Sequence, residues 1–181
     1  MSLKELTRSK HSNAERSWFA GRMISGQITN EEYSVYLKQQ YECYKALEDR
    51  FSKLDSTDDS LPENLKRADS ILEDLKELCS NIKNITVLDS TKKYTDYILN
   101  ECKADMLYAH VYVRYLGDLK GGQMIAKQIP GMGKYYKFED PDGLEQFIRN
   151  QLRQDKQFVD ECNKCFDSAI TLFKDLKSYL S

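Results

Sequence analysis

The fold is decided by the stretch Tyr112-Val-Arg-Tyr-Leu-Gly-Asp-Leu-Lys-Gly-Gly-Gln-Met124, which reads as helix although Gly117, Gly121 and Gly122 interrupt it. Each glycine inside a helix costs about 1 kcal/mol relative to alanine, so the run needs a physical reason. Gly117 and Gly121 are four residues apart and open one bare patch on a single helix face, with Asp118 beside it. A flat ligand could lie on that patch. Close packing against another helix is the alternative explanation.

The segment before the glycines is rich in β-branched and aromatic residues, and by propensity alone Tyr108 to Tyr115 could be a strand. No strand partner is evident, and apolar residues upstream recur with helical spacing. We therefore expect a helix that begins near Ser90 and runs into the glycine region. Pro130-Gly-Met-Gly133 should end it.

Helical periodicity covers most of the remaining chain. It predicts helices over residues 2–20, 29–54, from Ser60 onward, 143–155, and a last helix that ends at Leu180. Thr29 and Ser60 each begin a capping-box pattern, and residues 55–60 form a polar loop. The sequence thus predicts an all-α single domain, residues 1–181, of about seven or eight helices.

The composition limits the classes of function. A chain of 181 residues with a net charge of -2 has no basic excess for general nucleic-acid binding. No segment resembles an export signal or is long enough to span a bilayer, so we expect a cytoplasmic protein without a membrane anchor. The five cysteines are an odd count, which indicates free thiols. Cys162 and Cys165 form a Cys-x-x-Cys pair with no histidine nearby in sequence, so a zinc or redox role is not expected.

His11 and His110 are the two histidines. Glu15 follows His11 by one helical turn and can accept the proton of one ring nitrogen, which leaves the other nitrogen free to bind a metal. The alternative is a surface histidine paired with its helical neighbour. The helix over 29–54 carries several tyrosines on one face, among them Tyr44, which suggests a cavity wall with hydroxyls directed at water or ligand.

The glycine stretch resembles the distal-helix signature of heme oxygenases, with its Arg-Tyr-Leu-Gly-Asp-Leu and Gly-Gly-Gln elements. The segment from Leu3 to Glu15 resembles the proximal-histidine segment of that family. Gly26-Gln-Ile-Thr29 and Tyr41-Glu-Cys-Tyr-Lys-Ala-Leu-Glu48 continue the resemblance in register over nearly the whole chain. It implies a multi-helix bundle that sandwiches heme between a proximal helix and a kinked distal helix.

The resemblance implies a role for each of these groups. His11 is the axial iron ligand, with Glu15 beside it, whereas the family position that His110 matches does not bind iron. The distal glycines would let the backbone lie against the heme: Gly117, Gly121 and Gly122.

Asp118 would hold an ordered water that relays a proton, and Tyr44 and Arg114 belong to the same catalytic group. An ion pair between Asp118 and Arg114 within the helix is the plainer alternative. Lys4, Tyr112 and Arg149 match positions that contact the heme propionates.

Two aromatic residues of the last helix, Phe166 and Phe173, are assigned to the heme-binding set. The chain departs from the animal pattern at Glu145, where those proteins have a lysine, and at Ala169, which replaces a polar residue. The first departure puts heme seating in question, and the second the arrangement of distal water.

The implied reaction uses heme b as both substrate and cofactor, with O2, and yields biliverdin, carbon monoxide and ferrous iron by attack at the α-meso carbon. Nothing in the sequence resembles a flavin or nicotinamide site, so the electrons must come from another protein. We expect a monomer that receives them from ferredoxin, with a flavoprotein reductase as the alternative. Four basic residues could receive an acidic partner, although a solvated face explains them equally: Lys120, Lys127, Arg149 and Arg153.

Two other functions stay open. A non-catalytic heme-binding or storage protein would keep His11 and lack turnover, which the presence of Asp118 argues against. A helical hydrolase of the thiaminase type would need a nucleophilic cysteine, and no cysteine has a histidine close to it in sequence.

Overall fold

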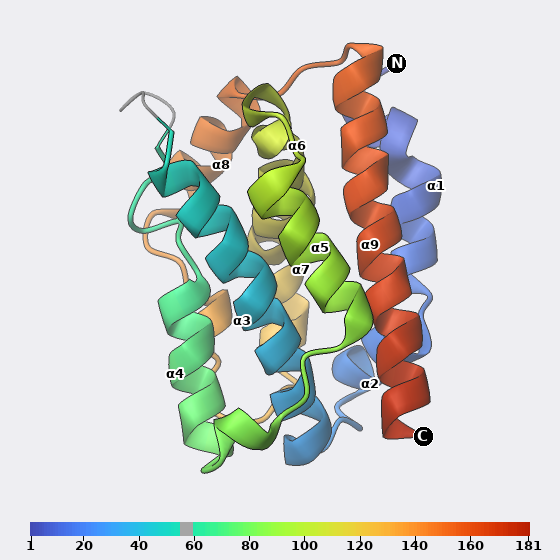
Figure 1. Ribbon diagram of the computed structural model, residues 1–181, viewed down its shortest axis with the longest axis vertical. Helices are drawn as coiled ribbons and strands as arrows, with labels where there is room; N and C mark the ends of the chain where they lie inside the picture. Colours follow the sequence, from blue (N-terminus) through green and yellow to red (C-terminus); the bar gives the residue numbers. More distant parts are fainter. Residues whose placement is uncertain (55–59) are drawn as a thin grey trace.

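The computed structural model describes residues 1–54 and 60–181, and every regular element in them is helical (Figure 1). The expected all-α class is confirmed, and the strand alternative for the segment before the glycines is excluded. The α-helices are α1 (Leu3–Glu15), α2 (Trp18–Ser25), α3 (Asn30–Ser52), α4 (Ala68–Leu78), α5 (Asp89–Asn100), α6 (Leu107–Val111), α7 (Gly117–Ala126), α8 (Pro141–Asn150) and α9 (Lys156–Leu180). Short turns of other helix types are η2 (Ile82–Asn84), η3 (Ala104–Met106), η4 (Tyr112–Leu116) and η5 (Lys134–Tyr136).

The helices pack around α3 and α9. Helix α3 lies against α4 and α5, and α9 lies against α1, α5 and α6. Figure 1 shows the first and last helices of the chain, α1 in blue and α9 in red, side by side along one edge of the molecule. Within the described residues, no helix combines the length and apolar character that a bilayer span requires.

The first predicted helix, residues 2–20, is wrong in one respect, because the structure divides it into α1 and α2. Ser2 begins α1 with a capping box that includes Glu5. Ser17 then caps α2, its side chain accepting a hydrogen bond from the Ala20 amide, so a new helix starts there instead of the old one continuing. Gly26 ends α2 in the left-handed conformation, at φ 73°, where glycine carries no steric cost.

The prediction that a helix restarts at Ser60 is also wrong, because α4 begins at Ala68. Its N-terminus is capped from another helix: the Glu48 carboxylate of α3 accepts hydrogen bonds from the backbone amides of Arg67, at 2.5 Å, and Ala68, at 3.2 Å. A carboxylate can satisfy the free amides of a helix N-terminus from any direction, so local sequence did not show where α4 starts. The predicted polar loop falls, apart from Ser60, outside the described residues.

The continuous helix expected from Ser90 through the glycines is interrupted. Helix α5 ends at Asn100, η3 and α6 follow, and η4, a single π-helical turn, joins α6 to α7. A π turn inserts an extra residue into the helix and bends it, which sets the direction of α7. The segment ends at Ala126, before Pro130, and α8 begins at Pro141 behind its cap Asp140. Because α8 ends at Asn150, it is shorter than the predicted 143–155.

Gly122 holds α7 against η5. A Cβ built on Gly122 would collide with the ring of Tyr136, which is almost fully buried and stacks on Tyr135 with ring centroids 4.2 Å apart. At this glycine, close packing is therefore the reason for the missing side chain. A Cβ on Gly121 would meet no atom within 4 Å.

We predict opposite effects on stability for the two adjacent glycines. Gly122→Ala should lower the free energy of unfolding by about 1–3 kcal/mol, because the methyl group overpacks against Tyr136. Gly121→Ala should raise it by about 0.5–1 kcal/mol through helix propensity. Denaturant unfolding of both variants beside the parent measures this, and equal effects would contradict the assignment of Gly122 to packing.

Candidate functional site

Two adjoining chambers lie between the N-terminal helices, α7 and α9. The larger, of about 420 Å³, is lined by residues of α1, α2 and α7 that include His11, Glu15, Gly117 and Gly121. The smaller, of about 140 Å³, extends toward α3 and α9. Both chambers share the residues Ala14, Tyr36, Gly117, Asp118 and Phe173, so they form one cavity.

His11 lies on the α1 wall of this cavity. Its Nε2 is 3.0 Å from Glu15 Oε1, and its side chain is 51% exposed. The imidazole also contacts the ring of Phe166, at a centroid distance of 5.6 Å. Glu15 engages only Nε2, so Nδ1 is free of this contact. The arrangement can therefore offer a nitrogen to a metal in the cavity.

The α7 wall is bare at the positions that the sequence singled out. A Cβ added to Gly117 or Gly121 would have no atom within 4 Å, and both residues line the cavity. Their missing side chains therefore leave open space, and helix packing does not explain them. His11 and these glycines come from segments more than 100 residues apart and line the same chamber.

Asp118, at the edge of the bare patch, is held by tyrosines. The Tyr44 hydroxyl donates a short hydrogen bond to Asp118 Oδ2. The ring edge of Tyr44 packs against Tyr135, and the Tyr135 hydroxyl accepts a hydrogen bond from Gln40 Nε2 at 2.9 Å. Burial raises the pKa of Asp118 to about 7, although the hydrogen bonds of Tyr44 and Tyr135 act to lower it. A carboxyl group with that pKa can give or take a proton near neutral pH.

Arg114 is buried one turn before Asp118 and is turned toward a different partner. Its Nε donates to the Tyr94 hydroxyl at 3.0 Å, and its guanidinium lies 4.2 Å from the centre of the Tyr94 ring. Arg114 and Asp118 both line the smaller chamber. The alternative of an ion pair between them is not found in the portion of the chain that the structure describes, where Asp118 is bound by Tyr44 instead.

The three residues expected to contact propionates are not among those that line the cavity. Lys4 is exposed on α1. Burial raises the pKa of Tyr112, while neighbouring Thr7 and Arg149 act to lower it, which places this phenol between α1 and α8. Arg149 is half exposed and pairs with Glu145 at 3.2 Å.

Glu145, the departure from the animal pattern, bridges two cations. Besides Arg149 it binds Lys120 Nζ of α7 at 2.9 Å. The bridge joins α8 to the exposed side of α7. Ala169, the other departure, lines the smaller chamber, as do Phe166 and Phe173.

Sequence reasoning missed Tyr36 and Tyr135. Tyr36 lines both chambers and stacks on Phe173, but it lies beside the helical stripe that was traced through α3. Tyr135 reaches Asp118 from η5, which lies between the predicted helix end at Pro130-Gly-Met-Gly133 and the predicted helix over 143–155. The adjacent pair Tyr135 and Tyr136 was the available signal, since two aromatic residues in a short loop usually anchor it to a core.

None of the five cysteines lines the cavity, and four of them are buried. A hydrolase that used a cysteine nucleophile in this cavity is therefore not supported.

The comparisons with known proteins agree with this geometry. A family model described as Heme oxygenase matches residues 1–175. The chain is 28% identical to heme oxygenase 2 of Mus musculus over 96% of its own length and 64% of the relative's length. It thus spans somewhat less than two thirds of that relative.

Two solved structures share the fold. Heme oxygenase-1 from the cyanobacterium Synechocystis sp. PCC6803, in complex with heme, superposes with a TM-score of 0.84 at 26% identity, covering 98% of this chain and 91% of that one. Heme oxygenase from Leptospira interrogans superposes with a TM-score of 0.81 at 27% identity, covering 96% of this chain and 98% of that one.

The fold and the site define a class: an all-helical protein with a cavity that has a histidine on one wall and a helix face without side chains on the other. The chain belongs to the heme oxygenase family.

We predict that Asp118 makes stability depend on pH. A carboxyl group whose pKa is about 7 in the folded protein binds more protons there than in the unfolded chain, between about pH 4 and pH 7. The free energy of unfolding should therefore fall as pH rises through that window. Asp118→Asn should remove this contribution, on the order of 4 kcal/mol over the whole window, and flatten the profile.

Denaturant unfolding at pH 5 and pH 8 measures the difference. The exposed Asp96 on α5 provides the matched control, and Asp96→Asn should keep the slope of the parent. Parallel profiles for Asp118→Asn and the parent would contradict the raised pKa.

Proposed function

We propose that this chain is a heme oxygenase that binds heme in the cavity and opens its ring to biliverdin, with release of carbon monoxide and ferrous iron. The single observation that supports the proposal is the cavity itself, with His11 on one wall and Gly117 and Gly121 on the facing segment. The Synechocystis relative, whose structure contains heme, supports heme as the ligand.

The residues present fit such a ligand. The cavity is lined mainly by apolar and aromatic side chains, an imidazole is available at one wall, and open space lies above the glycines. A flat ring needs that space on both faces, and a Cβ at Gly117 or Gly121 would enter it. Bound heme would supply the iron at which O2 is reduced and the ring carbon that is oxidised.

The chain would hold and aim this ligand through both walls. His11 would bind the iron, and Glu15 would keep the imidazole oriented by accepting the proton of the other ring nitrogen. On the opposite wall, the backbone at Gly117 and Gly121 would leave only one direction open along the ring. That restriction would select the α-meso carbon.

Asp118 would manage the proton that the reaction needs. It lies beside the bare patch with a pKa of about 7, so it can hold a water molecule and pass a proton through it at neutral pH. Tyr44 would fix the carboxyl group, and Arg114 would fix the position of Tyr94 behind it.

The propionates of bound heme and the electron donor would contact the same side of the protein. Lys4, Tyr112 and Arg149 would receive the propionates once Arg149 releases part of its contact with Glu145. The exposed Lys120, also paired with Glu145, adds positive charge nearby. An acidic one-electron carrier such as ferredoxin would suit that surface better than a flavoprotein reductase, and we propose it as the donor to a monomeric, cytoplasmic protein.

His11→Ala should remove the axial imidazole and so change the absorption spectrum of the heme complex, with weaker binding of heme. Free imidazole added to the variant should restore the spectrum, because it can occupy the space that the side chain leaves. A spectrum identical to that of the parent would show that another residue is the ligand.

The activity itself is tested by incubating the heme complex with O2 and reduced ferredoxin, or ascorbate, and identifying the products by chromatography. We expect biliverdin of the α type from the parent. Asp118→Ala should still bind heme but lose at least about 90% of the biliverdin yield, since a missing proton donor typically costs a hundredfold or more in rate. Heme binding without any turnover in the parent would favour a storage protein, and a normal yield from the variant would remove Asp118 from the mechanism.

A further inference from the structure

A second group of ligating side chains lies outside the heme cavity, at the far side of α6. It consists of Cys102, two residues beyond the end of α5, His110 on α6 and Glu161 on α9. One ligating atom of each residue lies within 4.8 Å of those of the other two. Cys102 and His110 are buried, and the side chain of Glu161 is 12% exposed. A thiol, an imidazole and a carboxylate from three separate segments thus converge.

The contacts within the group are short and share one atom. His110 Nε2 lies 2.8 Å from Glu161 Oε1, and Cys102 Sγ lies 3.5 Å from the same oxygen. The Tyr97 hydroxyl donates to that oxygen at 2.5 Å. In the absence of an ion, these three groups satisfy the carboxylate as hydrogen-bond donors, and a cation would replace the protons that now lie between the ligating atoms.

The backbone that carries Cys102 is fixed. Its amide donates to the carbonyl of Tyr97 at 2.8 Å, and its own carbonyl accepts a hydrogen bond from Arg50 Nη2 at 3.2 Å. The thiol itself lies 3.5 Å from Glu161 Oε1 and 3.5 Å from the carbonyl oxygen of Lys103.

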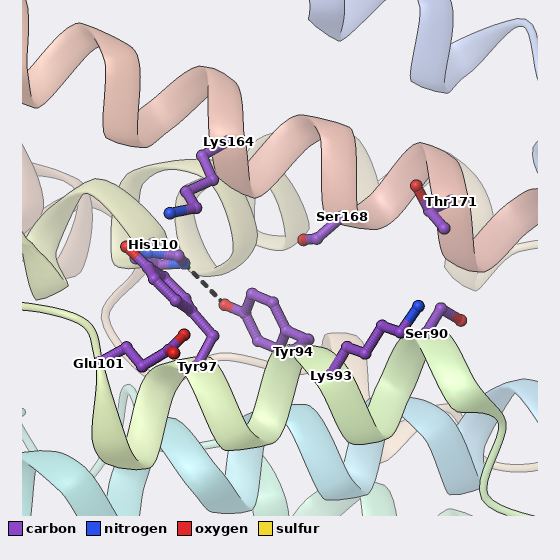
Figure 2. Close-up of a pocket in the computed structure, with 9 residues that line it drawn as sticks. All are labelled: Ser90, Lys93, Tyr94, Tyr97, Glu101, His110, Lys164, Ser168 and Thr171. Carbon is purple, nitrogen blue, oxygen red and sulfur yellow. Dashed lines mark hydrogen bonds between the residues drawn. The ribbon is translucent and has the colours of Figure 1, made fainter.

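His110 is oriented by its other ring nitrogen. Nδ1 lies 2.8 Å from the Tyr94 hydroxyl, the contact drawn as a dashed line in Figure 2. The Tyr94 oxygen accepts from Arg114, which can only donate, and its hydroxyl proton can turn to Cys165 Sγ at 3.9 Å. Nδ1 can then carry hydrogen and donate to Tyr94, which frees Nε2 as a ligand. Metal-bound histidines are commonly fixed in this manner.

A pocket leads from outside to His110. It has a volume of about 290 Å³ and lies between α5 and α9, with Tyr94, Tyr97 and His110 at one end and Ser90 and Thr171 at the other (Figure 2). Of the three ligating residues, only His110 lines this pocket, which also carries the carboxylate of Glu101 and the ammonium groups of Lys93 and Lys164. It gives solvent access to the imidazole, while Cys102 and Glu161 lie behind it.

We propose that Cys102, His110 and Glu161 form a binding site for a divalent transition-metal ion, with Zn²⁺ as the ion that fits best. Zinc with bonds of about 2.0 Å to N or O and about 2.3 Å to S separates an S and an O ligand by about 3.5 Å, and an N and an O ligand by about 3.3 Å. The first separation is already present, and the second requires His110 and Glu161 to part by about half an ångström.

The chemistry of the ligands selects the class of ion. Thiolate and imidazole favour zinc and its neighbours over Mg²⁺ and Ca²⁺, which prefer oxygen ligands. On binding, the protons of the Cys102 thiol and of His110 Nε2 leave to water, and the ion takes the place of the proton between His110 and Glu161. Water in the pocket, or the Tyr97 hydroxyl, completes the tetrahedron. The site would tie α9 and the end of α5 to α6, and none of its three residues lines the heme cavity.

The test uses Co²⁺ as a spectroscopic probe, added to the full chain without heme. We expect one ion per chain and a thiolate-to-cobalt charge-transfer band in the near ultraviolet. Cys102→Ser should abolish the band. Cys79→Ser, which removes the half-buried thiol most open to casual binding, should leave it unchanged. Circular dichroism of both variants confirms that they fold.

A band that is absent from the parent, kept in Cys102→Ser or lost in Cys79→Ser would overturn the proposal. If Cys102→Ser does not fold, crystals of the parent grown with Zn²⁺ decide the matter. Anomalous scattering at the zinc edge should place the ion among Cys102, His110 and Glu161. A peak elsewhere, or none, would likewise overturn the site.

Discussion

The cavity depends on keeping one face of α7 free of side chains while its other face is packed. Gly117 and Gly121 point into open space, whereas Gly122 lies against the ring of Tyr136. Adjacent residues on a helix point in directions about 100° apart, so two neighbouring glycines can serve different purposes. The contact with Tyr136 fixes α7 at the border of the cavity, which Gly122 and Tyr136 also line, and the π turn η4 sets the direction of the helix. A helix that could shift would lose the space that the bare face provides.

The charge states of Arg114 and Asp118 near that face depend on which hydrogen-bond partners each group finds in the low-dielectric interior. Arg114 is buried and directs its guanidinium to Tyr94. Asp118 is therefore left with phenol hydroxyls as its close partners, and hydroxyls stabilise a carboxylate less than an adjacent cation does. Burial raises the pKa of Asp118 to about 7, and these hydroxyl contacts offset only part of that rise. If Arg114 were paired with Asp118, the carboxyl group would stay ionised and could not exchange a proton near neutral pH.

Most of the helices could be predicted from the sequence, because apolar periodicity and caps such as Thr29 and Gly26 are local signals. The start of α4 could not, because its cap is Glu48 of another helix. The π turn η4 leaves no trace in helical spacing over so short a segment. In the site, His11 and the glycines were found through their motifs, whereas Tyr135 reaches Asp118 only through the tertiary packing of η5, which no local pattern records.

His110 is a second case in which tertiary packing creates a site that the sequence does not predict. In the sequence no cysteine stands near it, and a structural role was the natural interpretation. Folding brings Cys102 and Glu161 to one ring nitrogen and Tyr94 to the other. The Tyr94 hydroxyl also accepts from Arg114, which lines the cavity beside Asp118. The Tyr94 hydroxyl thus lies between the proposed metal site and the distal wall of the heme cavity. His110 and Arg114 share the Tyr94 hydroxyl oxygen as a hydrogen-bond partner, so a hydrogen-bonded chain connects the far side of α6 to the distal wall.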